Sequence, residues 1–307
     1  MSAVLLKQIV VMFLLMLVGL WLAKRDFISE ESASDMGTLL VRVVIPCVIL
    51  KSFFTEYSDK KMMGACVSFT LALVSLCIAV IISYIIYRDI KRVMNFASSF
   101  CNAGFIGIPL AQAAYGDDGV FYISAYIALL NIFQWTYGAY ILTGDRKNVN
   151  IPTVVKNPVV IALIVGLLVF VSRVTMPYIV IKSVGYIAAM NSPLAMIILG
   201  IYMSKLRLKD IFCDISVYIC SIFRLVLIPA VTLAFMVAVI RFVPIISTEI
   251  AMIILIAVCT PVGANIAVFA KQFNENYLLS VKTVCLSTII SVITIPAFMG
   301  VAGYCLQ

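Results

Sequence analysis

Charged residues are scarce in this chain of 307 residues: they make up 12% of the sequence, whereas hydrophobic residues make up 64%. A soluble domain carries roughly 25% charged residues, because its surface must face water. Apolar stretches of about 20 residues, the length that crosses the hydrocarbon core of a bilayer, follow one another almost from end to end. The composition therefore predicts an all-α integral membrane protein that interacts with the lipid bilayer.

Histidine is absent, and none of the nine cysteines belongs to a Cys-x-x-Cys pair. These absences exclude a zinc protease with a His-Glu-x-x-His helix, a serine hydrolase that uses histidine as its base, and a redox dithiol. We therefore expect no metal and no cofactor, and we interpret the cysteines as small apolar side chains.

Acidic side chains are missing from the middle of every apolar stretch. A cation/proton antiporter usually binds its cation with an intramembrane Asp or Glu, so the sequence disfavours this class. The ionisable residues inside the stretches are basic instead, chiefly Arg42 and Arg224, and each needs a partner. That partner is either a substrate carboxylate or a set of backbone carbonyls or lipid phosphates. We favour the structural partners for Arg224.

Ten membrane spans are predicted, and the short loops between them carry nearly all of the charge. Their approximate ranges are 4–23, 36–55, 63–87, 93–115, 119–142, 157–176, 184–204, 214–240, 247–270 and 278–304. The longest hydrophilic stretch, residues 143–156, is interpreted as a short cytoplasmic linker between a first half, 1–142, and a second half, 157–307.

Lysine and arginine are more frequent in the loops of one side, which the positive-inside rule assigns to the cytoplasm. Ten spans then place both termini outside the cell, in a multi-pass protein of the inner (plasma) membrane. No basic run is long enough to follow a phosphate backbone, so nucleic acid is not an expected partner.

The two halves correspond in the order of their spans, and Pro109 in the fourth span matches Pro261 in the ninth. Each half has five helices, an odd number, so the second half must be inserted upside-down relative to the first. Inverted repeats of this kind are the architecture of many secondary transporters.

Both of these spans contain helix-breaking residues: residues 101–109 read CNAGFIGIP and residues 259–265 read CTPVGAN. Proline cannot donate to the helix ladder, and glycine permits unusual backbone angles, so each span is predicted to unwind. Unwound backbone is tolerated at membrane depth only inside protein or beside water. Two half-helix N-termini meeting there, with the amides of Asn102 and Asn265, would suit an anion. The alternative is that the prolines and glycines mark simple kinks.

Further amides lie nearby in the sequence. Asn131 and Gln134 in the fifth span are three residues apart and share a helix face, and Gln112 follows the first break. These side chains either line the same cavity or join helices through interhelical hydrogen bonds.

The stretch 102–110 resembles the fourth-helix motif of the auxin efflux carrier family, which includes bacterial malonate and malate permeases. Three more stretches resemble the seventh, eighth and ninth helices of that family: NSPLAMIILG at 191–200, RLVLIP at 224–229, and TPVGAN at 260–265 followed by Phe269 and Ala270. The resemblance covers the whole chain, and the short loop after the fifth span is typical of the prokaryotic branch.

The resemblance implies two inverted five-helix repeats whose fourth and ninth helices are broken and cross at their prolines. Helices one, two, six and seven would form a scaffold, the rest a transport domain that moves like an elevator, and the protein would be a homodimer. It places Asn102 at the substrate carboxylate and Pro109 and Pro261 at the crossing. The full set of candidate substrate-binding residues is Asn102, Gly104, Ile108, Pro109, Gln112, Asn131, Gln134, Pro261, Gly263 and Asn265.

We therefore predict a secondary transporter of small organic anions, carboxylates such as malonate, malate or auxin-like acids. A sodium-coupled organic-anion symporter of bile-acid-carrier type is the alternative, and coupling to protons or to sodium stays open. An intramembrane enzyme would have to use Asp117 and Asp118, but adjacent side chains on a helix do not face each other. A channel would differ in its far higher flux.

Overall fold

A computed structural model describes residues 2–88, 91–145, 151–204, 214–243 and 246–306. Within these ranges every named element is helical, and the only β-type contact is an isolated antiparallel bridge between Cys101 and Val262. The prediction of an all-α protein is confirmed for this part of the chain. Residues 146–150 of the predicted linker lie outside the described residues.

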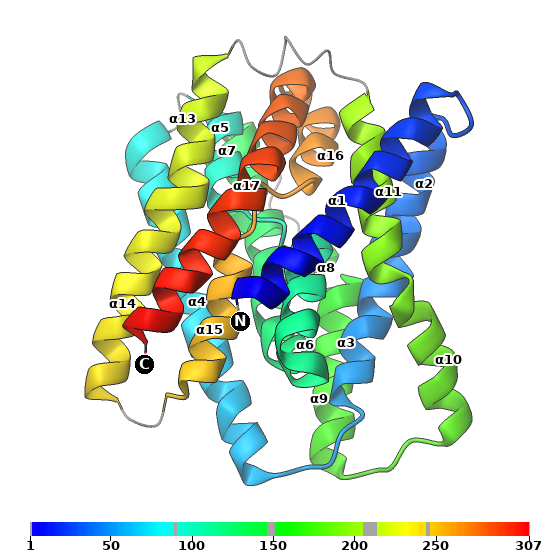
Figure 1. Cartoon of the computed structure of the whole chain (residues 1–307), viewed down its shortest axis with the longest axis vertical. Helices are drawn as coiled ribbons and strands as arrows, with labels where there is room; N and C mark the ends of the chain where they lie inside the picture. Colours follow the sequence, from blue (N-terminus) through cyan, green and yellow to red (C-terminus); the bar gives the residue numbers. More distant parts are fainter. Residues whose placement is uncertain (1, 89–90, 146–150, 205–213, 244–245, 307) are drawn as a thin grey trace.

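Most helices run roughly along the long axis of the molecule, whereas α1 and α17 cross it obliquely (Figure 1). Those of the first half are α1 Ser2–Lys24, α2 Glu30–Leu39, a π turn Leu40–Val44, α3 Ile45–Phe53, α4 Asp59–Tyr87, α5 Arg92–Ser99, a π turn Ala103–Gly107, α6 Ile108–Phe133, a π turn Gln134–Gly138, and α7 Ala139–Thr143. The predicted linker contains α8 Ile151–Val155. The helices of the second half are α9 Pro158–Ser172, α10 Tyr178–Ala189, α11 Asn191–Ser204, α13 Ile215–Ile222, a π turn Phe223–Leu227, α14 Ile228–Phe242, α15 Thr248–Val258, α16 Asn265–Gln272 and α17 Tyr277–Cys305.

Prolines account for three of the π turns. Pro46, Pro109 and Pro229 each lie in the first turn of the α-helix that follows such a turn. Proline has no N–H to give to the carbonyl four residues earlier, and its ring presses on that turn, so the helix widens locally. Each helix therefore continues through its proline with a change in winding instead of a break.

By length and composition, seven helices among the described residues can cross a bilayer. One of them, Ala103–Thr143, contains the end of the predicted fourth span and all of the fifth; the boundary between the two lies at Gly116, whose φ of 63° and ψ of −147° interrupt the helical path. The shorter apolar helices Pro158–Ser172 and Thr248–Val258 belong to the predicted sixth and ninth spans. The chain is thus built as a multi-pass membrane protein, and the number of ten spans stays a prediction.

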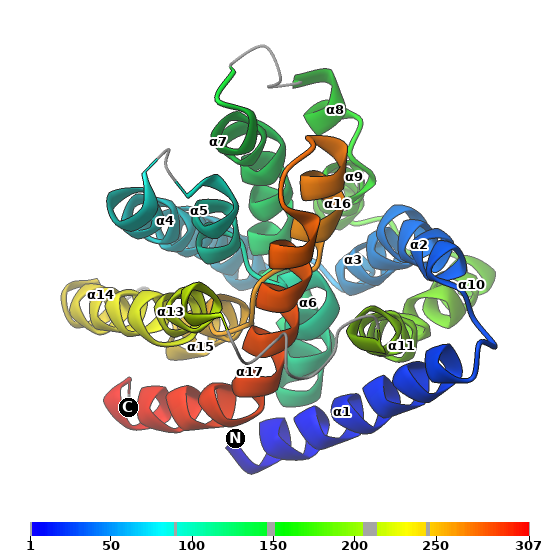
Figure 2. The same cartoon turned by 90° about the horizontal axis from the view of Figure 1, so that it is seen from above.

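The helices form two groups with α6 between them (Figure 2). In one group α1 packs along α11, and α3 packs along α9 and α10. In the other group α4 packs on α5, α14 on α15, and α13 on α17. The most enclosed helix is α15, in which every residue from Ile250 to Val258 is buried. Because α15 ends at one of the two helix breaks, the unwound backbone lies inside protein.

Two glycines allow α1 and α11 to approach each other closely. A Cβ at Gly19 would lie 2.1 Å from the carbonyl oxygen of Ile197, and a Cβ at Gly200 would lie 2.0 Å from that of Met16. Both neighbours are backbone atoms, which cannot rotate away. Small residues at such positions are the usual means by which membrane helices pack backbone against backbone.

We expect Gly200→Ala to destabilise the protein by about 1–3 kcal/mol, the usual range for overpacking. Gly185→Ala in α10 is the matched control, because a Cβ there meets no atom within 4 Å. Alanine is also better in a helix interior by about 1 kcal/mol. Thermal unfolding of the purified variants in detergent measures both effects. A Gly200→Ala variant that unfolds at or above the wild-type temperature would contradict the close packing.

Candidate functional site at the helix crossing

The two unwound stretches meet and pair with each other through their backbones. The N–H of Asn102 donates to the carbonyl of Pro261 at 2.8 Å, and the N–H of Gly263 donates to the carbonyl of Phe100 at 3.0 Å. These two bonds flank the bridge between Cys101 and Val262. The predicted breaks are therefore confirmed as unwound segments, and two backbone N–H groups and two carbonyls of these segments satisfy one another.

Gly263 is required by this pairing. A Cβ at position 263 would lie 2.9 Å from the carbonyl oxygen of Cys101 and 3.3 Å from its carbonyl carbon. The neighbouring N–H, that of Val262, donates to Ser287 Oγ at 3.2 Å, which ties the second unwound stretch to α17. Hydrogen bonds between the two unwound stretches, and a further bond to α17, thus stabilise the crossing.

Arg224 lies behind the crossing and is fully buried. Its Nη1 donates to the carbonyls of Ser98 at 3.2 Å and Ser99 at 3.5 Å, and its Nη2 donates to the carbonyl of Val258. These carbonyls end α5 and α15, where a helix leaves its last C=O groups without partners. The favoured prediction for Arg224, a structural pairing with backbone carbonyls, is confirmed.

Asn102 is the polar side chain at the front of the crossing. It is 5% exposed, and its Nδ2 has no hydrogen-bond partner among the described residues. It lines a small cavity of about 30 Å³ together with Gly104, Asn131, Gly263 and Asn265. A buried donor without an acceptor costs free energy, which a ligand oxygen in this cavity would recover.

A much larger cavity, of about 690 Å³, adjoins the small one and shares Asn131 and Asn265 with it. Two cationic side chains line it: Arg42 from the π turn after α2, and Lys156 from the segment before α9. No Asp or Glu of the described residues lines either cavity. The charged side chains of the described residues that line the two cavities are therefore all positive.

Amide pairs fix the walls of these cavities. Asn265 Nδ2 donates to Gln134 Oε1 at 3.2 Å, which joins α16 to the π turn after α6. Asn157 Nδ2 donates to Asn131 Oδ1 at 3.3 Å, while Asn157 Oδ1 caps the start of α9. Gln134 thus serves as a helix-joining residue, and Asn131 both joins helices and lines the cavities.

Not all of the predicted site residues meet at the crossing. The structure brings together Asn102, Gly104, Asn131, Pro261, Gly263 and Asn265. Pro109 lies in the first turn of α6, and the residue of the first break whose backbone pairs with the second break is Cys101. Ile108 and Pro109 are buried in packing, and Gln112 is exposed; none of the three lines either cavity.

Sequence reasoning missed Lys156, Asn157 and Thr38 as lining residues. The first two belong to the linker and the start of the sixth span, and Thr38 precedes the π turn of Arg42. The dipeptide Asn157-Pro158 was a usable signal, because asparagine before a helix-starting proline is a typical N-cap. Its position against Asn131 depends on tertiary packing.

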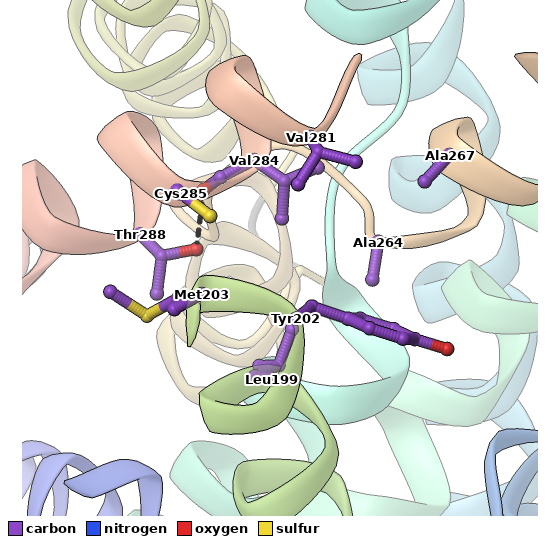
Figure 3. A pocket seen from close by; sticks show the side chains of 9 residues that line it. All are labelled: Leu199, Tyr202, Met203, Ala264, Ala267, Val281, Val284, Cys285 and Thr288. Carbon is purple, nitrogen blue, oxygen red and sulfur yellow. Dashed lines mark hydrogen bonds between the residues drawn. The ribbon is translucent and has the colours of Figure 1, made fainter. Parts of the chain in front are cut away.

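A third cavity, beside α11, does not suit an anion (Figure 3). It lies between α11, α16 and α17, has a volume of about 10 Å³, and is lined mainly by apolar side chains such as Leu199, Val281 and Val284. Its Thr288 hydroxyl already donates to the carbonyl of Val284 at 2.7 Å. This volume holds about one water-sized probe.

The two adjacent aspartates are engaged in surface ion pairs. Asp117 pairs with Lys51 at 3.3 Å, and Asp118 pairs with Lys61 at 2.7 Å. Asp117 is exposed, Asp118 is partly exposed, and the two carboxylates pair with different lysines, so they form no acid–base dyad.

Comparisons with known proteins agree with the whole-chain resemblance. A family model described as "Membrane transport protein" matches residues 4–299. An uncharacterized transporter of Methanocaldococcus jannaschii is 22% identical over 237 residues, which cover 72% of this chain and 76% of that protein. The family match reaches from α1 into α17 and so includes both helix breaks.

We expect Gly263→Ala to open the backbone pairing, because the new Cβ would collide with the Cys101 carbonyl. Hydrogen–deuterium exchange of peptides that span residues 100–107 should become about tenfold faster or more, since overpacking costs roughly 1–3 kcal/mol. Gly107→Ala is the control, because its Cβ would meet only side-chain atoms, at 3.3 Å or more. Equal exchange in both variants would argue against the pairing.

Proposed function

The chain belongs to the membrane transport protein family, the family of the auxin efflux carriers, and we propose that it is a secondary transporter of small organic anions. The observation that carries this proposal is the charge of the large cavity. Arg42 and Lys156 line it, no described carboxylate does, and it shares Asn131 and Asn265 with the small cavity that the partnerless Asn102 amide lines. Such a cavity attracts anions and repels cations.

A carboxylate fits the inner end of this cavity. One carboxylate oxygen would accept a hydrogen bond from Asn102 Nδ2, which no other described group uses. The N-termini of the helical segments that begin at Ala103 and Asn265 would add partial positive charge there. The amide supplies a donor without the desolvation cost of a buried lysine or arginine.

Helix pairing supports two inverted repeats of five helices each. A two-fold relation between the halves exchanges the first span with the sixth and the second with the seventh. It therefore exchanges the pair α1–α11 with the pair α9–α3, and both pairs are in contact. It also exchanges the two breaks, which pair with each other. In this proposal the group of α1, α3, α9 and α11 is the scaffold, and the group with the crossing moves against it.

The proposed location is the plasma membrane, with the mouth of the cavity at Lys156 on the cytoplasmic side. The C-terminal end of α1 and the N-terminal ends of α5 and α17 lie at the same end of the molecule (Figure 1). Loops rich in lysine and arginine favour the cytoplasm.

A thermal-shift screen of the purified protein identifies the anion, because a ligand that binds only the folded state raises the unfolding temperature. Dicarboxylates such as malonate and malate, and aromatic acids, are tested beside organic cations of equal size. We expect stabilisation by one or more anions and none by the cations. Stabilisation by cations alone would overturn the proposal.

Uptake of the selected anion into proteoliposomes then tests the residues. We expect Asn102→Ala to weaken apparent affinity about tenfold or more, since a hydrogen bond to a charged group contributes roughly 1.5–3 kcal/mol. Arg42→Gln and Lys156→Gln should each weaken it about two- to fivefold, because exposed charges act through water. Lys182→Gln on α10 removes a cation that lines neither cavity and is the control. Unchanged affinity in Asn102→Ala would remove the crossing from the binding site.

A further inference from the structure

Arg224 carries a buried charge that no described carboxylate neutralises. The ion pairs of the described residues are Lys51–Asp117, Lys61–Asp118 and Arg92–Glu275, and none includes Arg224. Its guanidinium donates to three neutral backbone carbonyls and lies beside the uncharged Tyr126 hydroxyl, and its Nε has no hydrogen-bond partner among the described residues. An unpaired buried charge is expensive, so a purely structural tie would be made more cheaply by an uncharged donor.

The charge of Arg224 lies at the ends of the two broken helices. Each broken helix has two ends at the crossing: the C-terminal end of its first part, with partial negative charge, and the N-terminal end of its second part, with partial positive charge. Arg224 covers both C-terminal ends, at Ser99 and Val258. The N-terminal ends, at Ala103 and Asn265, lie by the cavity.

We propose that Arg224 is a positioning residue that makes the crossing electropositive: its charge offsets the two negative helix ends, so that the positive ends act unopposed on an anion at Asn102. This inference rests on the proposed transport of anions. Arg224 touches no substrate in this account. It acts through the backbone that it holds and through its field.

The distance permits this effect. Three Cα–Cα steps join Ser99 to Asn102, which limits their backbones to a separation of about 11 Å. At an effective dielectric constant of about 20, a unit charge at this range changes the affinity for a monoanion by about tenfold. Because the Coulomb energy is proportional to the charge of the ligand, the change for a dianion is about the square of that factor, roughly 100-fold.

The test compares binding of a dianion and a monoanion of the same skeleton, succinate and its monoamide, by titration calorimetry of the full chain. If Arg224 had only a structural role, Arg224→Gln would weaken the binding of both ligands by the same factor. If the field of its charge acts on the ligand, Arg224→Gln weakens the binding of succinate more than that of the monoamide, so the ratio of the two affinities falls at least about fivefold. Arg224→Lys keeps the charge but reaches fewer carbonyls, and we expect it to keep the wild-type ratio at reduced stability.

A second pair of variants keeps the experiment decisive if Arg224→Gln does not fold. Ser98 is fully buried beside the guanidinium, and its hydroxyl has no partner. Ser98→Asp would neutralise Arg224 in place, whereas Ser98→Asn has nearly the same shape without charge. The ratio of the succinate affinity to the monoamide affinity should fall in Ser98→Asp and stay at the wild-type value in Ser98→Asn.

The outcomes separate the two proposals. If the wild-type protein binds the anions and the ratio is unchanged in both Arg224→Gln and Ser98→Asp, the role of Arg224 is overturned and the transport proposal stands. If the wild-type protein binds neither anion nor any acid of the thermal-shift screen, the transport proposal fails and this inference fails with it.

Discussion

The pairing of two unwound backbones at Cys101 and Val262 is the contact on which the rest of the structure depends. Peptide groups that leave a helix inside a membrane must find partners, and here each break supplies partners for the other. This requirement explains why both halves carry a break, why position 263 is glycine, and why α15 is enclosed on all sides. One break alone would leave its carbonyls and amides unsatisfied, so the two breaks are stable only together.

Three basic side chains surround this crossing. Arg224 lies behind it, Arg42 and Lys156 lie along the cavity in front of it, and the carboxylates of the ion-paired residues lie at the surface. Asn102 offers an uncharged hydrogen-bond donor at the crossing. A site built in this way holds an anion without a permanently buried ion pair, which would be costly when the site is empty. That property suits a carrier, which must bind and also release its cargo.

The sequence predicted the parts of this arrangement that depend on local chemistry. The two breaks followed from proline and glycine within apolar spans, and carbonyl partners for Arg224 followed from the cost of a buried charge. The sequence did not predict the positions of residues that are set by tertiary packing. Pro109 was assigned to the crossing, but a proline in the first turn of a helix is tolerated there, so the chain unwinds seven residues earlier, at Asn102. Lys156 was counted as a loop residue, because only the docking of α9 beside α6 brings it to the cavity.

The central claim is that an organic anion binds in the cavity between Asn102 and the two cationic side chains, Arg42 and Lys156. A crystal structure with bromosuccinate, phased on the anomalous signal of bromine, tests it most directly. We expect a bromine peak within this cavity and a carboxylate within hydrogen-bond distance of Asn102 Nδ2. A saturated peak elsewhere on the protein, with the cavity holding only water, would contradict it.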